Sequence, residues 1–343
     1  LAAPCQPAPP LTTENRRCVC RLRSQILTCG ADTFVKVFDA DNLAAEPRTI
    51  EHHDSPVTTL AINKKGRHIV TGTEAHMVQY FSYPGCEFEK NLTRTQSPIQ
   101  HVAFDAKGKF VAVGGDDGVI RMCSTMVSHY SILKSHTDSI LCVAFDPKGE
   151  YLASSSADGT VTLWDITDEA TVVKTIRVTS KVAQGSSQRM RIAWHPTGSH
   201  LAIPYSNGVH LLERSSWQIS SMLVNGHSKE VSHVAWSPNG QYIATSGLDR
   251  QVFLWQISTG ESLDRHKTDA VCTDLSWSTR DNALAFLDES GQLHLWRGPV
   301  PSHLPSPSAD PATAAEKAAV AAEQAAAAPK AEAAAGGAAA AGG

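Results

Sequence analysis

The sequence predicts an all-β protein, a seven-bladed β-propeller whose first blade is incomplete, followed by a low-complexity Ala-rich tail. Three observations support this fold class. Asp- and Gly-rich turns separate short alternating strands, and the composition changes abruptly to Pro, Ser and Ala after Trp296. A period of about 40–45 residues is typical of four-stranded propeller blades. Apolar or aromatic residues recur here at intervals of 41 to 49 residues, by subtraction of their positions, at Ile62, Phe104, Phe145, Trp194, Trp236 and Trp277.

The clearest unit opens with Ser135-His136 and closes with Trp164-Asp165. Between them lie an apolar strand, an Asp-Pro-x-Gly turn, a second strand and the tight turn Asp158-Gly159. Asp-Gly between alternating strands is a strong hairpin signal, because the primed two-residue turn needs a positive φ that Gly adopts freely. This order of strands and turns resembles the WD repeat of propeller proteins.

The earliest unit is partial, with a middle strand at 25–29 and an end at Phe38-Asp39. Counting it, we expect seven blades, because a single blade cannot bury both of its faces and neighbouring blades must cover them. Only residues 17–23 are available for its innermost strand, and they have poor strand character. No strand is evident that would close the ring from the amino-terminal side. We therefore expect an incomplete first blade and an imperfectly closed ring.

Composition divides the chain into three segments. Residues 1–17 are a Pro-rich, irregular leader, 18–298 form the propeller, and 299–343 are a Pro/Ser linker followed by an Ala-rich tail. Residues 179–187 lengthen one repeat and are interpreted as an inserted loop. Ala is the best helix former, but the tail lacks a large apolar stripe. We expect it to be partly helical and exposed to solvent.

Charge and cysteine usage exclude several functions. The net charge is -4, with 30 Lys and Arg against 34 Asp and Glu, which is not the basic footprint of a nucleic-acid-binding protein. The eight cysteines include no Cys-x-x-Cys pair, so we expect free thiols of a reducing compartment. No signal peptide or long apolar run is present. We predict an intracellular protein without a membrane segment, metal or cofactor.

Two sets of His, Asp and Trp recur at blade spacing. They are His136, Asp158 and Trp164 in one unit, and His227, Asp249 and Trp255 in another. In WD repeats these residues form a structural hydrogen-bond network with a Ser or Thr of the middle strand, here Ser154 or Ser156. A nucleophilic triad would occur once rather than at the repeat period. We interpret both sets as structural and predict no catalytic residue.

The loops at the ends of the blades are the remaining candidates for function, because loops held by a rigid scaffold usually carry binding residues. For each charged loop residue the alternative is a solvated side chain without a partner. The candidate partner-binding residues are Asp116, Arg189, Arg191, Lys229, Glu230, Arg250 and Glu289.

One repeat narrows the range of possible functions. It keeps Ala193-Trp194, has the apolar run 201–204 where other blades have small polar residues, and ends in 213–217, Glu-Arg-Ser-Ser-Trp. Over Gln25 to Trp296 the chain resembles the amino-terminal propeller of the acidic nucleoplasmic DNA-binding protein, or chromosome transmission fidelity protein four, family. The resemblance implies a nuclear replisome scaffold that connects DNA polymerase alpha with the replicative helicase and supports sister-chromatid cohesion.

The same resemblance locates the trimerising domain and the main client-binding sites of that family beyond this propeller. It therefore implies a docking module for proteins or chromatin, with the oligomeric state left open. Two alternatives remain at this point. One is a generic WD-repeat adaptor, such as a ubiquitin-ligase substrate receptor or a chromatin-complex subunit. The other is a propeller hydrolase, which would need a converging acid/base or metal set in the channel, and the sequence shows none.

Overall fold

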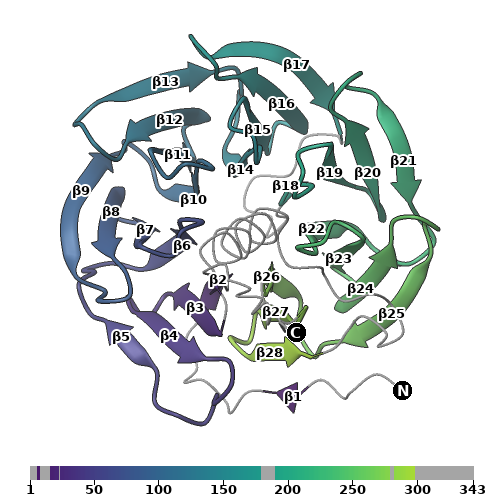
Figure 1. Ribbon diagram of the computed structural model, residues 1–343, viewed down its shortest axis with the longest axis horizontal. Coiled ribbons are helices and arrows are strands. Elements are labelled where there is room, and N and C mark those ends of the chain that lie inside the picture. The colour runs from purple at the N-terminus through teal and green to yellow at the C-terminus, as the bar shows by residue number, and fades with distance from the viewer. Residues whose placement is uncertain (1–5, 8–15, 23, 179–189, 279–281, 298–343) are drawn as a thin grey trace, which may run out of the picture. The chain divides into compact units, whose positions relative to one another are not determined.

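A computed structural model describes residues 6–7, 16–22, 24–178, 190–278 and 282–297. The chain divides into two units, Leu1–Ser302 and His303–Gly343, and all described residues lie in the first. The described residues form seven four-stranded sheets arranged around a central axis (Figure 1), so the predicted seven-bladed propeller is confirmed. The predicted insertion at 179–187, the segment 299–343 and most of the leader lie outside the described residues.

The first three blades use consecutive strands. Blade 1 consists of β2 (Arg16–Leu22), β3 (Gln25–Gly30), β4 (Val35–Asp39) and β5 (Arg48–Ile50). Blade 2 consists of β6 (Val57–Ile62), β7 (His68–Thr73), β8 (Met77–Ser82) and β9 (Phe88–Arg94). Blade 3 consists of β10 (Ile99–Phe104), β11 (Phe110–Gly115), β12 (Val119–Ser124) and β13 (Tyr130–Lys134).

The next three blades continue in the same way. Blade 4 consists of β14 (Ile140–Phe145), β15 (Tyr151–Ser156), β16 (Thr160–Asp165) and β17 (Thr171–Arg177). Blade 5 consists of β18 (Ala193–Trp194), β19 (His200–Tyr205), β20 (Gly208–Glu213) and β21 (Ile219–Leu223). Blade 6 consists of β22 (Val231–Trp236), β23 (Tyr242–Gly247), β24 (Gln251–Gln256) and β25 (Ser262–Lys267).

Blade 7 combines the two ends of the ring. Its inner strands are β26 (Cys272–Trp277), β27 (Leu284–Asp288) and β28 (Leu293–Trp296). Its outermost strand is β1 (Gln6–Pro7), which pairs antiparallel with β28 and lies at its outer edge in Figure 1. The expectation that no amino-terminal strand closes the ring is therefore wrong, and β1 lies within the leader that we expected to be irregular.

The expected incompleteness of blade 1 is also wrong, because β2 is its innermost strand and pairs with β3 along its length. Cys18 packs into the cluster between blades 1 and 2, whereas Val19 packs into the cluster between blades 7 and 1. Successive side chains of a strand point to opposite faces, so both faces of β2 are buried. Packing against two other blades, rather than local propensity, makes this segment a strand.

The hydrophobic core is distributed among the seams between blades. Each described cluster combines side chains of two neighbouring blades, as where Ile140 and Trp164 of blade 4 pack with Ile120 of blade 3. Burying one such large apolar side chain stabilises the fold by roughly 1.5–3 kcal/mol. The buried thiols Cys123 and Cys142 contribute to these clusters, and burial raises the pKa of each to about 12. They act as small hydrophobic groups.

The predicted anchor residues end the innermost strands of blades 2 to 7. Three of them, Trp194, Trp236 and Trp277, also donate their indole N–H to a carbonyl oxygen of the preceding blade. The acceptors are Ala144 at 3.0 Å, Ala193 at 3.1 Å and Ala235 at 3.0 Å, in the same order. Each anchor therefore fills a seam and forms a directional bond across it.

Side chains of β26 close the ring onto β2. The Asp274 carboxylate accepts the Val19 N–H at 2.9 Å, and the Ser276 hydroxyl accepts the Arg21 N–H at 3.0 Å. Val19 is almost fully buried, so its N–H has little access to water as an alternative partner. This seam joins strands from the two ends of the propeller, and neither bond follows from local sequence.

We expect Asp274→Ala to lower the free energy of unfolding by about 1–3 kcal/mol, because a buried backbone N–H loses its acceptor. Asp274→Asn keeps an oxygen at the same place and should lose less. Urea denaturation followed by tryptophan fluorescence measures both variants. An Asp274→Ala protein as stable as the parent would show that this hydrogen bond does not hold the seam.

Candidate functional site

The blade 4 residues predicted to form a network lie together in the structure. The imidazole of His136 has its Nδ1 2.9 Å from the Asp158 carboxylate and its Nε2 2.8 Å from the Ser154 hydroxyl. The Trp164 indole N–H donates to the same hydroxyl at 2.9 Å. Of the two hydroxyls considered from the sequence, Ser154 is the one in the network. Ser156 instead donates to the Asp138 carbonyl at 2.9 Å.

Blade 6 repeats this arrangement with Thr in place of Ser. The His227 Nδ1 lies 3.0 Å from Asp249, and its Nε2 lies 2.8 Å from the Thr245 hydroxyl, which accepts the Trp255 N–H at 2.8 Å. Gly226 precedes the histidine, and a Cβ there would stand 2.5 Å from the Trp255 ring. The Gly-His pair thus lets the chain pass close to the tryptophan while the histidine reaches the hydroxyl.

Burial makes these sets unsuitable as nucleophilic triads. Ser154 is fully buried, and the His136 side chain is 1% exposed, so a substrate has no access to the hydroxyl. Burial lowers the pKa of His136, opposed by its hydrogen bond to Asp158. Burial alone would raise the pKa of Asp158, but hydrogen bonds from Thr160 and His136 hold it below its usual value. A neutral histidine between a carboxylate and a hydroxyl satisfies every buried polar group.

Two further networks were missed from the sequence. In blade 2, His53 Nε2 lies 2.9 Å from the Thr71 hydroxyl, and Phe81 lies beside the imidazole without an indole N–H to donate. In blade 7, His294 Nε2 lies 3.0 Å from Asp288, within one hairpin. The sequence does show His52-His53 where a blade begins, but no sequence motif marks Thr71 as the partner of His53. The Asp288–His294 pair lacks a Gly-His opening and so has no sequence signal.

We expect Thr245→Val to lower the free energy of unfolding by about 1–3 kcal/mol, because the buried Trp255 N–H and His227 imidazole both lose a partner. Thr245→Ser retains the hydroxyl and serves as the matched control, with a smaller loss. Chemical denaturation of the three proteins compares them. If Val and Ser destabilised equally, methyl packing rather than the hydroxyl would be the source of stability.

The stability should also depend on pH through His53. Burial, with a smaller effect of His52, lowers the pKa of His53 from 6.5 to about 4, and its Nδ1 has no hydrogen-bond partner among the described residues. Between these pH values the unfolded chain binds the proton and the folded chain does not. Stability is therefore lost as pH falls from 6.5 towards 4, by up to about 1.4 kcal/mol per pH unit.

His53→Gln retains a group that bonds Thr71 but does not titrate, so the slope of unfolding free energy against pH should become shallower in that window. Urea denaturation at several pH values measures the slope. An unchanged slope in the variant would assign the acid sensitivity to other groups.

One face of the ring carries the candidate docking residues. Because strands alternate in direction, the connections between blades and the turns between second and third strands lie at the same end of the blades. We call this the inter-blade face, and the opposite one the hairpin face. Backbone hydrogen bonds tie its two kinds of loop together, as where Leu248 N–H bonds the Glu230 carbonyl at 2.9 Å and Glu289 N–H bonds that of Val271 at 2.8 Å.

Blades 6 and 7 bring most of the predicted contacts onto this face. Lys229, Glu230, Arg250 and Glu289 are exposed there, whereas exposed Asp116 lies on the same face in blade 3. Arg250 has a φ of 60° at the turn position where blade 4 has Gly159, with a φ of 81°. A non-glycine residue in this region stores backbone strain, and such residues are enriched at functional sites.

Two predicted contacts do not lie on the exposed surface that is described. Arg189 lies outside the described residues. Arg191 was expected to be exposed but is buried, at 6% exposure. Its guanidinium donates to the Leu141 carbonyl at 3.3 Å, and its backbone N–H bonds the Ser232 carbonyl at 2.9 Å. Arg191 therefore links blades 4, 5 and 6, and we withdraw it from the docking residues.

Comparisons with known proteins agree with the ring as described. Residues 13–295 match the model of the WDHD1 first WD40 domain. The chain belongs to this family. The match includes the whole of β2, β26 and β27, and all of β28 except Trp296. The coarser part of the sequence resemblance thus holds, since the chain is a WD40 propeller of the WDHD1 type.

The similar proteins are much longer than the matched region. Human WD repeat and HMG-box DNA-binding protein 1 is 30% identical over 281 residues, covering 79% of this chain and 24% of that protein. Minichromosome loss protein 1 of Schizosaccharomyces pombe is 25% identical over 283 residues, covering 81% and 34%. Protein ENHANCER OF LHP1 1 of Arabidopsis thaliana is 32% identical over 283 residues, covering 81% and 30%. The chain thus spans about a quarter to a third of these relatives.

Proposed function

We propose that this propeller is the non-enzymatic docking module of a nuclear scaffold for DNA replication and chromatin, which connects DNA polymerase alpha with the replicative helicase. The observation that supports it most is the family match over residues 13–295, which spans the ring from blade 1 to blade 7. Relatives named for HMG-box DNA binding and for minichromosome loss agree with a role on chromosomes. The proposal that DNA polymerase alpha and the replicative helicase are the partners comes from the resemblance of the 190–217 repeat to replisome scaffolds.

The inter-blade face has the properties of a protein-binding surface. Lys229 and Arg250 lie among Glu230 and Glu289, so charges of both signs are held on loops tied down by backbone bonds. Mixed charge on a rigid frame favours selective protein contacts, because a wrong partner places like charges together. A nucleic-acid surface would instead concentrate Lys and Arg. We therefore propose proteins as the direct partners, with any contact to DNA secondary.

We expect the immobilised full chain to retain polymerase alpha and helicase subunits from nuclear extract. The double variant Lys229→Glu, Arg250→Glu should reduce their recovery at least about fivefold, because both charges on the face are reversed. Lys109→Glu is the matched control, since Lys109 is exposed on the hairpin face. Quantitative mass spectrometry of the retained proteins is the measurement.

The recovered partners decide between the two binding functions. Subunits of a ubiquitin ligase or of another chromatin complex, without polymerase or helicase, would support the generic adaptor instead. Equal loss of all partners in the Lys109→Glu control would show that the inter-blade face is not the docking surface.

A further inference from the structure

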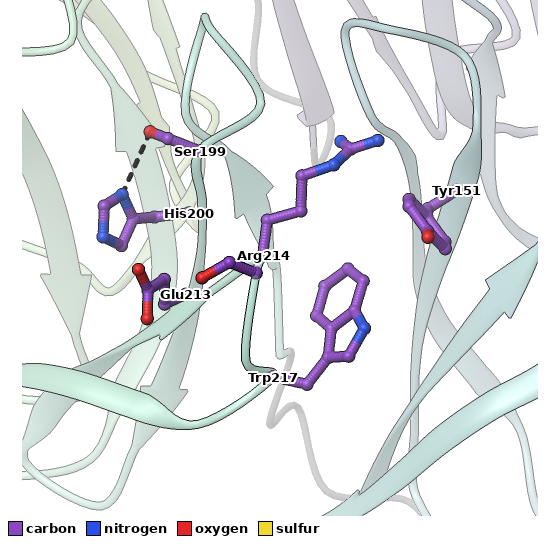
Figure 2. A pocket seen from close by; sticks show the side chains of 7 residues that line it. Tyr151, Ser199, His200, Glu213, Arg214 and Trp217 are labelled. Atoms are coloured by element: carbon purple, nitrogen blue, oxygen red, sulfur yellow. Dashed lines mark hydrogen bonds between the residues drawn. The ribbon is translucent and has the colours of Figure 1, made fainter.

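A cavity lies on the hairpin face at the seam between blades 4 and 5, away from the face proposed above. Its volume is about 470 Å³, and Figure 2 shows Arg214 and Trp217 extending from blade 5 on one side and Tyr151 of blade 4 on the other. The turn between β20 and β21 supplies much of its wall. The lining residues are Tyr151, Ser199, His200, Glu213, Arg214, Ser215 and Trp217.

The last position of this turn holds an unusual residue. Trp217 has a φ of 52°, and its N–H bonds the Glu213 carbonyl at 2.9 Å. In blade 6 the equivalent residue is Gly260, with a φ of 72° and an N–H bond to the Gln256 carbonyl at 2.9 Å. A bulky side chain in the left-handed region is a conformational outlier, and such outliers are enriched at ligand-binding positions. Blade 2 has Cys86 here, with a φ of 62° and an N–H bond to the Ser82 carbonyl at 3.0 Å, so the turn itself does not require an indole.

The first position of the turn is equally unusual. In blades 1 to 6 its N–H bonds the carbonyl just before the second strand, and the other five of these blades place Ala40, Tyr83, Thr125, Ile166 and Ile257 there. Blade 5 has Arg214, whose guanidinium crosses the seam to bond Asp146 and Glu150 of blade 4. The guanidinium also lies over the Tyr151 ring, 4.6 Å from its centroid. It forms an ion pair with the buried Asp146 carboxylate across the seam.

The Trp217 indole is only partly used by the fold. Its ring meets those of Tyr151 and Trp194 edge-on, at interplanar angles of 79° and 77°. Among the described residues its N–H donates no hydrogen bond, unlike those of Trp194 and Trp236, which bond across their seams. A partly exposed indole with this free donor offers a surface on which a planar cation can lie.

Carboxylates outnumber cations at this end of blades 4 and 5, whereas the cavity lining itself holds one of each, Glu213 and Arg214. The cations at this end are Lys148, Lys174 and Arg214. Hydrogen bonds from Ser216 and Ser215 lower the pKa of Glu213, so it remains ionised at neutral pH. Asp165, the strand partner of Tyr151, likewise has its pKa lowered by the Thr167 hydroxyl and N–H. The carboxylates at this end of blades 4 and 5 are Glu150, Asp165, Asp168, Glu169 and Glu213.

We propose that this cavity binds an arginine side chain carried by an extended segment of a partner protein. The guanidinium lies over the Trp217 ring and bonds the Glu213 carboxylate, and the partner backbone accepts the Trp217 N–H. Arginine suits the site because its planar group stacks on aromatic rings and pairs with a carboxylate through two N–H groups. The site is independent of the inter-blade face, so either proposal stands if the other fails.

The test uses the full chain labelled with 5-fluorotryptophan, whose Trp217 resonance is assigned through Trp217→Phe. The probe is the peptide acetyl-Gly-Arg-Leu-Arg-Gly-amide, and a peptide with Glu for Arg and a thymidine decamer are the comparison ligands. We expect a saturable shift of the Trp217 resonance with the Arg peptide alone. Glu213→Gln should weaken binding about fivefold, the effect of losing one charge-assisted pair. Glu46→Gln, in the exposed loop between β4 and β5 of blade 1, should leave it unchanged.

A second variant separates binding from folding. Trp217→Gly places at the turn the residue that blade 6 has there, so the propeller should still fold. The fluorescence anisotropy of the fluorescein-labelled Arg peptide should then show no binding to this variant. The proposal would be overturned if the Trp217 resonance of the parent protein showed no saturable shift with the Arg peptide. It would also be overturned by a shift produced by the Glu peptide or the thymidine decamer, or by Arg-peptide binding that persists in Trp217→Gly.

Discussion

Every blade of this protein depends on its two neighbours, because a four-stranded sheet has two apolar faces and can cover neither alone. The core is accordingly a series of seams, each combining side chains of two blades, as in the cluster that joins Val19 and Ile26 of blade 1 to Leu287 of blade 7. Such an arrangement is stable only if the series closes, since an open end would expose an apolar face and an unpaired strand edge. The seam between β2 and β26 and the pairing of β1 with β28 meet that requirement.

Polar groups inside the blades follow the same logic at smaller scale. The tryptophans that end the third strands of blades 4 and 6 bring an indole N–H into the core, and the hydroxyl of Ser154 or Thr245 accepts it. A histidine and an aspartate then complete each network, leaving no buried group without a partner. Blade 2 shows a reduced network, because Phe81 has no N–H to donate and no carboxylate reaches the imidazole. The buried Nδ1 of His53 is left without a hydrogen-bond partner among the described residues.

The seams and the hydrogen-bond networks account for the interior residues. The candidate binding residues therefore lie on the loops at the ends of the blades. Arg250 and Trp217 occupy turn positions that hold a glycine in another blade, Gly159 and Gly260, and the two turns lie on opposite faces. Each accepts backbone strain to hold a large side chain at the surface. The inter-blade face offers mixed charge on tied loops, whereas the hairpin face offers a cavity with an indole and, around it, more carboxylates than cations. A scaffold with two separate faces can hold two partners at once.

The blade number, the innermost-strand ends from Ile62 to Trp277 and the residues of the blade 4 and blade 6 networks were determined by the sequence itself. These features repeat with the blade period or arise within one hairpin, so a local pattern is enough to reveal them. Tertiary structure alone decided that β2 is a strand, that β1 completes blade 7 and that Arg191 is buried. It also decided that Arg214 reaches Asp146 in the next blade. In each of these cases the partners belong to different blades or, for β1, to the opposite end of the chain, and no periodic signal connects them. The separation is 255 residues between Val19 and Asp274, and 289 residues between Gln6 and Leu295 by subtraction.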